Sequence, residues 1–168
     1  MRYTLVGRWF NLNQLEQLES EACKDGIKVV DYSFDSPNIK GLYCDGTVGI
    51  SDNLKTNAEK LCVLAEELGH HHTSTGNILD MSSASNRNQE QKARIWSYNK
   101  LIDLQGFINA FEHHCTNLYE TATFLGVTEQ FLADTINAYM HKYGCYIKYK
   151  NYVIEFGFNS ANVIKQYN

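Results

Sequence analysis

The sequence lacks most of the features that mark membrane, secreted and nucleic-acid-binding chains. It has a single proline, no C-x-x-C pair, and a formal net charge of −4 with a pI near 5.8. Without excess positive charge, bulk binding to nucleic acid or to an anionic membrane is not expected. No segment approaches the ~20 apolar residues that a membrane span requires. The N-terminal stretch also turns charged without a small-residue cleavage site. We therefore expect a cytoplasmic protein without a signal peptide.

The cysteines are few and odd in number. There are five of them, at positions 23, 44, 62, 115 and 145. This pattern fits reduced thiols in a cytosolic protein better than a disulfide framework. We expect most of these side chains to fill the core.

The composition is otherwise that of an ordinary globular protein, and the sequence predicts helices and strands along the chain. The 168 residues, 43% hydrophobic and 20% charged, suit one domain or one catalytic unit with a small appendage. Apolar spacing predicts a first helix around residues 12–22, ended by Gly26. Three short strands should follow, at residues 27–34, 41–46 and 47–51, with the last two hinged at Asp45-Gly46.

The second half of the chain is predicted to be mostly helical. Helices are expected at residues 58–72 and 88–104, with a polar loop at 73–85 between them and a break at Gly106. Helix should resume at residues 107–118, and short helices should surround Gly126. The aromatic, alternating tail predicts a terminal hairpin turned at Lys150-Asn151. The order of elements indicates an α+β protein.

The stretch LAEELGHHH, residues 64–72, carries the candidate catalytic motif. Glu66 and His70 stand at i and i+4, so a helix places both on one face, where they can hold one metal ion. Metallopeptidases of the H-E-x-x-H type use this spacing, and their Glu at i+1 takes a proton from the attacking water. Glu67 occupies that position. Glu66 replaces the first His of the motif, and a carboxylate is also a zinc ligand.

A third ligand must come from another element. Downstream candidates are Asp80, Glu90, Glu112, His113 and His114. We favour Glu90 because it lies near the start of the next helix, and because Ala93, one turn on, allows close helix contact. Two carboxylates and one imidazole form a harder, more anionic set than two imidazoles and one carboxylate. We expect zinc, with manganese or iron also tolerated. His71 and His72 are expected to be helix-end residues favoured by the helix dipole, not ligands.

Three stretches resemble the ImmA/IrrE family of zincin-like metallopeptidases, in particular its short phage and mobile-element members in Gram-positive bacteria. They are KLCVLAEELGHHHT, NRNQEQKARIWSYNKLI and ETATFLGVTEQFLADTINAY, and the resemblance runs from about residue 41 to the chain end. The family's catalytic helix carries H-E-x-x-H, and a Glu in a following E-x-x-A helix completes the site. The resemblance therefore implies that His70 and Glu90 are ligands and Glu67 is the base. Glu66 departs from the family pattern.

The resemblance also implies an activity and an architecture. Family members cleave a helix-turn-helix repressor, often encoded next door, and so derepress a prophage or mobile element. The implied fold is a zincin-like metallopeptidase core over residues 1–112, with helices and a small three-stranded sheet. Residues 113–168 would form a C-terminal, helix-turn-helix-like piece with a terminal hairpin, packed on the core. We expect an enzyme that hydrolyses peptide bonds. The alternative is a non-catalytic regulator that binds and sequesters the repressor.

Two further residues or segments invite a functional interpretation. Tyr98 could donate to the oxyanion, although core packing is the expected role. The stretch LYETATFLGVTEQFL has helix-turn-helix spacing, but its second helix, residues 128–134, has no Lys or Arg. Its acidic residues would meet phosphates unfavourably, so no direct nucleic-acid contact is expected. A helical packing module and a docking surface for the repressor both remain open.

Overall fold

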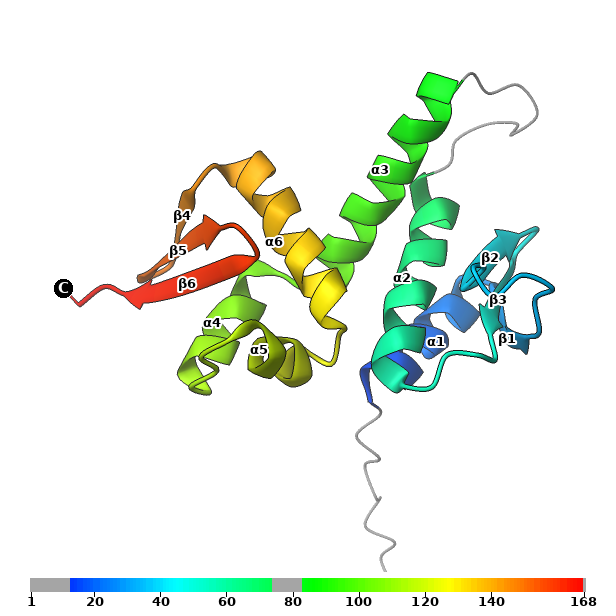
Figure 1. Cartoon of the computed structure of the whole chain (residues 1–168), viewed down its shortest axis with the longest axis horizontal. Coiled ribbons are helices and arrows are strands. Elements are labelled where there is room, and N and C mark those ends of the chain that lie inside the picture. The colour runs from blue at the N-terminus through cyan, green and yellow to red at the C-terminus, as the bar shows by residue number, and fades with distance from the viewer. Residues whose placement is uncertain (1–12, 74–82, 168) are drawn as a thin grey trace, which may run out of the picture.

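The structure, a computed structural model, describes residues 13–73 and 83–167. These residues form six helices and two three-stranded sheets, so the predicted α+β class is confirmed. The two sheets lie at opposite ends of the molecule with helices between them (Figure 1). The helices are α1 (Gln14–Lys24), α2 (Asn57–Thr73), α3 (Ser83–Leu101), α4 (Leu104–Glu112), α5 (Leu118–Leu125) and α6 (Glu129–Tyr143).

The first sheet contains the three strands expected from the sequence. They are β1 (Lys28–Tyr32), β2 (Gly41–Cys44) and β3 (Thr47–Ser51), in the order β1-β3-β2. Strand β3 pairs parallel to β1 and antiparallel to β2. The hinge was placed correctly, because Asp45 and Gly46 both take the positive φ that a tight two-residue hairpin requires. Val48 and Ile50 of β3 are buried on the face covered by α1 and α2.

Helix α2, which carries the candidate motif, spans Asn57–Thr73 and so agrees to within one residue at each end with the helix predicted over 58–72. Thr56 and Glu59 form a reciprocal cap: the Glu59 amide donates to Thr56 Oγ1 at 3.1 Å, and the Thr56 amide donates to Glu59 Oε2 at 2.9 Å. The apolar face predicted for this helix is buried, and its members are Leu61, Leu64, Ala65 and Leu68. This burial fixes which side of α2 remains for the polar motif.

The predicted break at Gly106 is wrong. Helix α3 ends at Leu101, and α4 begins at Leu104, so Gly106 lies inside α4. The break is made by Asp103, whose Oδ1 accepts from the Gly106 amide at 2.7 Å and caps the new helix. The helix predicted over residues 107–118 also ends early, at Glu112. The polar loop predicted at 73–85 falls mainly on residues 74–82, which lie outside the described residues.

The C-terminal segment confirms the helix pair around Gly126 and extends the terminal hairpin. Gly126 ends α5 in the left-handed conformation at φ 69°, and Thr128 caps α6. The second sheet consists of β4 (Tyr146–Tyr149), β5 (Tyr152–Gly157) and β6 (Ser160–Lys165), paired antiparallel in chain order. The turn at Lys150-Asn151 is as predicted. The third strand, β6, was missed, and it makes the hairpin a meander.

One continuous set of buried side chains connects the two ends of the molecule. It runs from Leu15 of α1 through α2, α3 and α6 to Phe156 of β5. Six residues of α6 are buried, so this helix is a central packing element. The division of the chain at residue 112 stays a prediction. Within residues 13–73 and 83–167, no helix is long and apolar enough to cross a membrane.

The expectation that most cysteines fill the core is wrong. All five are free thiols, but only Cys62 is buried, and Cys115 is half-buried. Cys23, Cys44 and Cys145 are exposed. Burial raises the pKa of the Cys62 thiol from 9.0 to about 11, although Thr128 offsets part of that effect by hydrogen bonding.

Candidate active site

The candidate site lies where α2 packs closely against α3. A Cβ atom on Gly69 would stand only 2.3 Å from the carbonyl oxygen of Ala93, and Ala93 is fully buried. The close approach thus requires a glycine at position 69, and it occurs at Ala93, the small residue expected to lie at the helix contact. As a result, Nε2 of His70 lies 3.4 Å from Oε2 of Glu90. The structure brings these two predicted ligands together.

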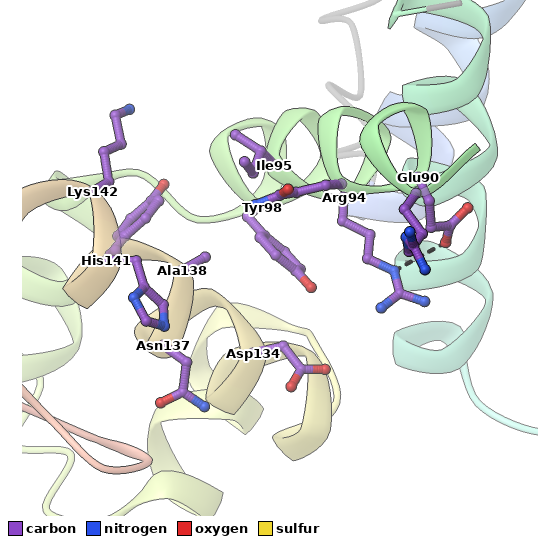
Figure 2. A pocket seen from close by; sticks show the side chains of 12 residues that line it. Glu90, Arg94, Ile95, Tyr98, Asp134, Asn137, Ala138, His141 and Lys142 are labelled. Atoms are coloured by element: carbon purple, nitrogen blue, oxygen red, sulfur yellow. Dashed lines mark hydrogen bonds and ion pairs between the residues drawn. The ribbon is translucent and has the colours of Figure 1, made fainter. Parts of the chain in front are cut away.

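Arg94 determines how the Glu90 carboxylate is presented. Its Nε donates to Oε1 of Glu90 at 3.0 Å (Figure 2). The other oxygen, Oε2, faces His70. Arg94 follows Glu90 by four residues on α3, so both side chains share one face of the helix. This residue was not singled out from the sequence, although its i, i+4 spacing from a suspected ligand was a usable signal.

Glu66 lies in the same electrostatic environment, one turn before His70. Burial raises the pKa of its carboxyl; the positive charge of Arg94 lowers it, and the negative charges of Glu90 and Asp134 raise it again. The carboxylates of Glu66 and Glu90 thus repel one another across the interface between α2 and α3. A cation between them would relieve that repulsion.

Glu67 points from α2 toward the sheet. Its Oε2 accepts a hydrogen bond of 2.9 Å from the backbone amide of Tyr43 in β2. Burial, together with the charges of Glu66 and Glu90, raises the pKa of Glu67 to about 7, and the Tyr43 hydrogen bond opposes that rise. A carboxyl with a pKa near neutrality is suited to general-base work. The backbone contact to Tyr43 could not be read from side-chain patterns.

Gly41 explains how β2 approaches the motif so closely. A Cβ atom at this position would lie 2.5 Å from Val63 Cγ1 and 2.9 Å from Glu67 Cγ. Because glycine has no Cβ, the edge strand can lie directly against α2, where the Tyr43 amide reaches Glu67. The sequence places this glycine at the start of β2.

The types of side chain and the distance between His70 and Glu90 fit a divalent metal, although the described side chains bring only two of the three proposed ligands together. In the described part of the chain, no three His, Cys, Asp or Glu side chains are arranged to hold an ion. However, two ligands about 2.0–2.1 Å from a tetrahedral ion stand about 3.3 Å apart. The 3.4 Å between His70 and Glu90 matches that spacing. Glu66 would have to turn toward them to complete the set.

The other candidates for a third ligand have partners elsewhere or lie outside the described residues. Glu112 accepts hydrogen bonds from Tyr152 at 2.7 Å and from Lys165 at 3.0 Å, beside the second sheet. His113 ends α4 and lies against the ring of Phe124, and His114 follows it with a positive φ. Asp80 falls in residues 74–82.

The neighbouring histidines are engaged away from Glu90. Nδ1 of His71 lies 2.6 Å from the hydroxyl of Tyr43. His72 stacks on Trp96 with ring centroids 4.6 Å apart, and burial lowers the pKa of its imidazole. Both rings therefore help pack the end of α2, in line with the helix-end role expected for them.

Tyr98 packs in the core, as expected, and the donor role considered for it stays a prediction. Its ring is 7% exposed and packs edge-on against Phe131. Burial and the charges of Asp134 and Glu66 raise the pKa of its hydroxyl to about 12, so it stays a hydrogen-bond donor at neutral pH. It lines a cavity together with Glu90 and Arg94.

These features define a class of protein: an α+β fold with a carboxylate- and imidazole-rich site between two packed helices. The sequence profile described as the IrrE N-terminal-like domain, a peptidase family, matches residues 22–137, which is more than half of the chain. The chain belongs to this family. Its general character is therefore that of a metal-dependent peptidase, as the resemblance implied. No curated protein and no solved structure shows a significant match to the chain.

Proposed function

We propose that the protein is a metal-dependent endopeptidase that cleaves a helix-turn-helix repressor and so derepresses a prophage or mobile element. The observation that carries this proposal is the meeting of His70 and Glu90 at 3.4 Å beside Glu67, a carboxyl with a pKa near 7. Family membership supports the peptidase class. The repressor as target follows from the family resemblance.

The residues divide the chemical work. Glu66, His70 and Glu90 would hold a divalent ion, zinc in the first instance, and manganese or iron as harder alternatives. Lewis acidity toward water and the peptide carbonyl is the chemistry such an ion supplies. Glu67 would accept the proton of the attacking water and later deliver it to the leaving amine. Tyr98 would donate a hydrogen bond to the carbonyl oxygen as negative charge develops.

The direct test is hydrolysis of a helix-turn-helix repressor, which we expect to be encoded beside this gene. The purified protein is mixed with that repressor and Zn²⁺ or Mn²⁺, and products are identified by intact-mass spectrometry. We expect one cut, and Glu67→Gln should reduce its rate by at least about 100-fold, because general-base catalysis contributes 10²–10⁴. Equal cleavage by Glu67→Gln would contradict the role of this residue.

A second function is favoured by a specific observation. Glu66 replaces a histidine, and the described side chains do not gather three ligands. A regulator that binds and sequesters the repressor without cutting it would need no such assembly. In that case the repressor would bind the metal-free protein, and Glu90→Ala would not weaken the complex. Under the endopeptidase proposal, Glu90→Ala abolishes cleavage.

A further inference from the structure

A groove of about 840 Å³ lies between α3 and α6 and ends at the candidate site. Along α6, Asp134, Asn137, Ala138 and His141 follow at i, i+3, i+4 and i+7, so one face of the helix forms a wall. Figure 2 shows these side chains in order, opposite the α3 side chains that run to Glu90. The groove is therefore continuous with a residue proposed as a metal ligand.

The dimensions of the groove suit a short length of extended chain. From Asp134 to His141 the helix rises about 10 Å, at 1.5 Å per residue. About three residues of extended polypeptide cover that distance. The volume is also within the 300–1,000 Å³ typical of ligand sites. A chain lying in the groove would reach Glu90 at one end and His141 at the other.

Charged side chains line both ends of the groove. At the site end, Arg94 is paired with Glu90, and Arg87 and Asp134 also line the groove. At the far end, Lys142 lies beside His141, and its Nζ sits 4.7 Å from the ring centre of Tyr143. Among the described residues, no carboxylate pairs with Lys142. A cation without an ionic partner at the end of a groove favours an anionic side chain on whatever binds there.

The middle of the groove is apolar. Ile95 is 39% exposed there, on a helix that contacts both α2 and α6. Ala138 lies opposite, and its small side chain leaves the groove open. An apolar side chain of a bound segment would cover this surface and remove it from water.

We propose that this groove binds the substrate next to the bond that is cleaved, as about three extended residues. An apolar side chain lies over Ile95 and Ala138, and an acidic side chain lies against Lys142. The substrate class is thus a protein segment that carries an apolar and then an acidic residue, counted outward from the bond. The inference rests on the proposed endopeptidase function, although peptide binding in the groove does not require hydrolysis.

The test is affinity selection with a random nonapeptide pool. The full-length chain is immobilised as Glu67→Gln, so that bound peptides are not cut, and retained peptides are sequenced by mass spectrometry. We expect Asp and Glu to be enriched roughly two- to fivefold over the input, as for one partly exposed ion pair. The same chain carrying Lys142→Glu should lose this preference and favour Lys and Arg.

Two control variants separate the groove from the rest of the surface. Lys148→Glu makes the same charge change on an exposed strand residue outside the groove, and it should leave the selection unchanged. Ala138→Tyr should close the groove and reduce retention of all peptides, with circular dichroism confirming that the variant is folded. Unchanged retention by a folded Ala138→Tyr variant would overturn the proposal.

Other outcomes are equally decisive. The same acidic preference in the Lys142→Glu variant, or no peptide retained at all, overturns the groove as a peptide site. A dimer that Lys142→Glu dissociates, without peptide capture, would show that a second copy of the chain fills the groove, which also overturns it. If peptides are selected as expected but the repressor is never cut, the endopeptidase proposal fails and the groove stands. If the repressor is cut at equal rates with and without Lys142→Glu, the groove proposal fails alone.

Discussion

At the residue scale, the candidate site depends on how Arg94 uses one oxygen of Glu90 and leaves the other toward His70. A hydrogen-bonded partner that orients a ligand typically changes metal affinity by 10–100-fold. We therefore expect Arg94→Gln to weaken Zn²⁺ binding by roughly tenfold, measured by titration calorimetry on metal-free protein. Arg94→Lys keeps the charge, so its affinity for Zn²⁺ should lie between those of the wild type and Arg94→Gln. Tighter binding by Arg94→Gln would instead mean that Arg94 competes with the metal for Glu90.

Cys62 offers a test of burial that is independent of the active site. Because its pKa is raised to about 11, the thiol stays protonated at pH 8, and only the thiolate reacts with alkylating reagents. Because the thiol ionises less readily in the folded state than in the unfolded state, the free energy of unfolding should fall as the pH rises above 9. We expect iodoacetamide at pH 8 to label Cys23, Cys44 and Cys145 first and Cys62 last, as read by peptide mass spectrometry. All five should react alike in denaturant, and early labelling of Cys62 in the folded protein would contradict its burial.

At the element scale, the contact of α2 with α3 positions the site. A Cβ on Gly69 would meet backbone, which cannot swing away as a side chain can. We expect Gly69→Ala to destabilise the protein by about 3 kcal/mol in urea unfolding, at the upper end of overpacking effects. It should also weaken metal binding, because the helices that carry His70 and Glu90 would separate.

Gly106→Ala is the matched control for this prediction. Gly106 is also a helical glycine, but its added Cβ would meet side chains alone, the nearest being a flexible Leu125 methyl at 3.3 Å and Asp103 Oδ1 at 3.5 Å. The gain in helix propensity is about 1 kcal/mol, so this variant should be neutral or slightly more stable. Equal stability of the two variants would show that the interface between α2 and α3 is looser than described.

The elements differ in how well the sequence predicted them. Helix α2 and the hinge at Asp45-Gly46 were predictable because their signals are local: apolar period, turn chemistry and charge. The position of Glu90 was predictable because Ala93 permits helix contact. The break before α4 was misplaced because a glycine was given more weight than the capping side chain of Asp103. Strand β6 was missed because its pairing depends on β5 and not on its own residues.

Some features of the site could not have been found in the sequence at all. The Tyr43 amide that holds Glu67 is a backbone group, and every residue but proline has one. The groove arises only when α6 is placed beside α3, two helices separated in the chain by α4 and α5. Arg94 was within reach, because its spacing from Glu90 is a standard pair on one helix face.

At the scale of the whole molecule, metal binding should be visible as stability. A ligand that binds only the folded state at 100 times its Kd adds about 2.7 kcal/mol, which raises Tm by roughly 5–10 °C for a chain of this size. We expect such a shift on adding Zn²⁺ to chelator-treated protein. Glu90→Ala should abolish it, whereas Glu112→Ala, which removes a rejected candidate ligand, should keep it. A shift that survives Glu90→Ala but is lost in Glu112→Ala would reassign the third ligand.

We infer that Glu66, His70 and Glu90 together hold one catalytic metal ion. The metal content of untagged, purified protein, measured by inductively coupled plasma mass spectrometry, tests this inference directly. We expect about one divalent ion per chain in the wild type and far less than one in His70→Ala and in Glu90→Ala. A wild-type protein that repeatedly takes up no metal from zinc-, manganese- or iron-supplemented medium, yet still binds the repressor, would contradict it.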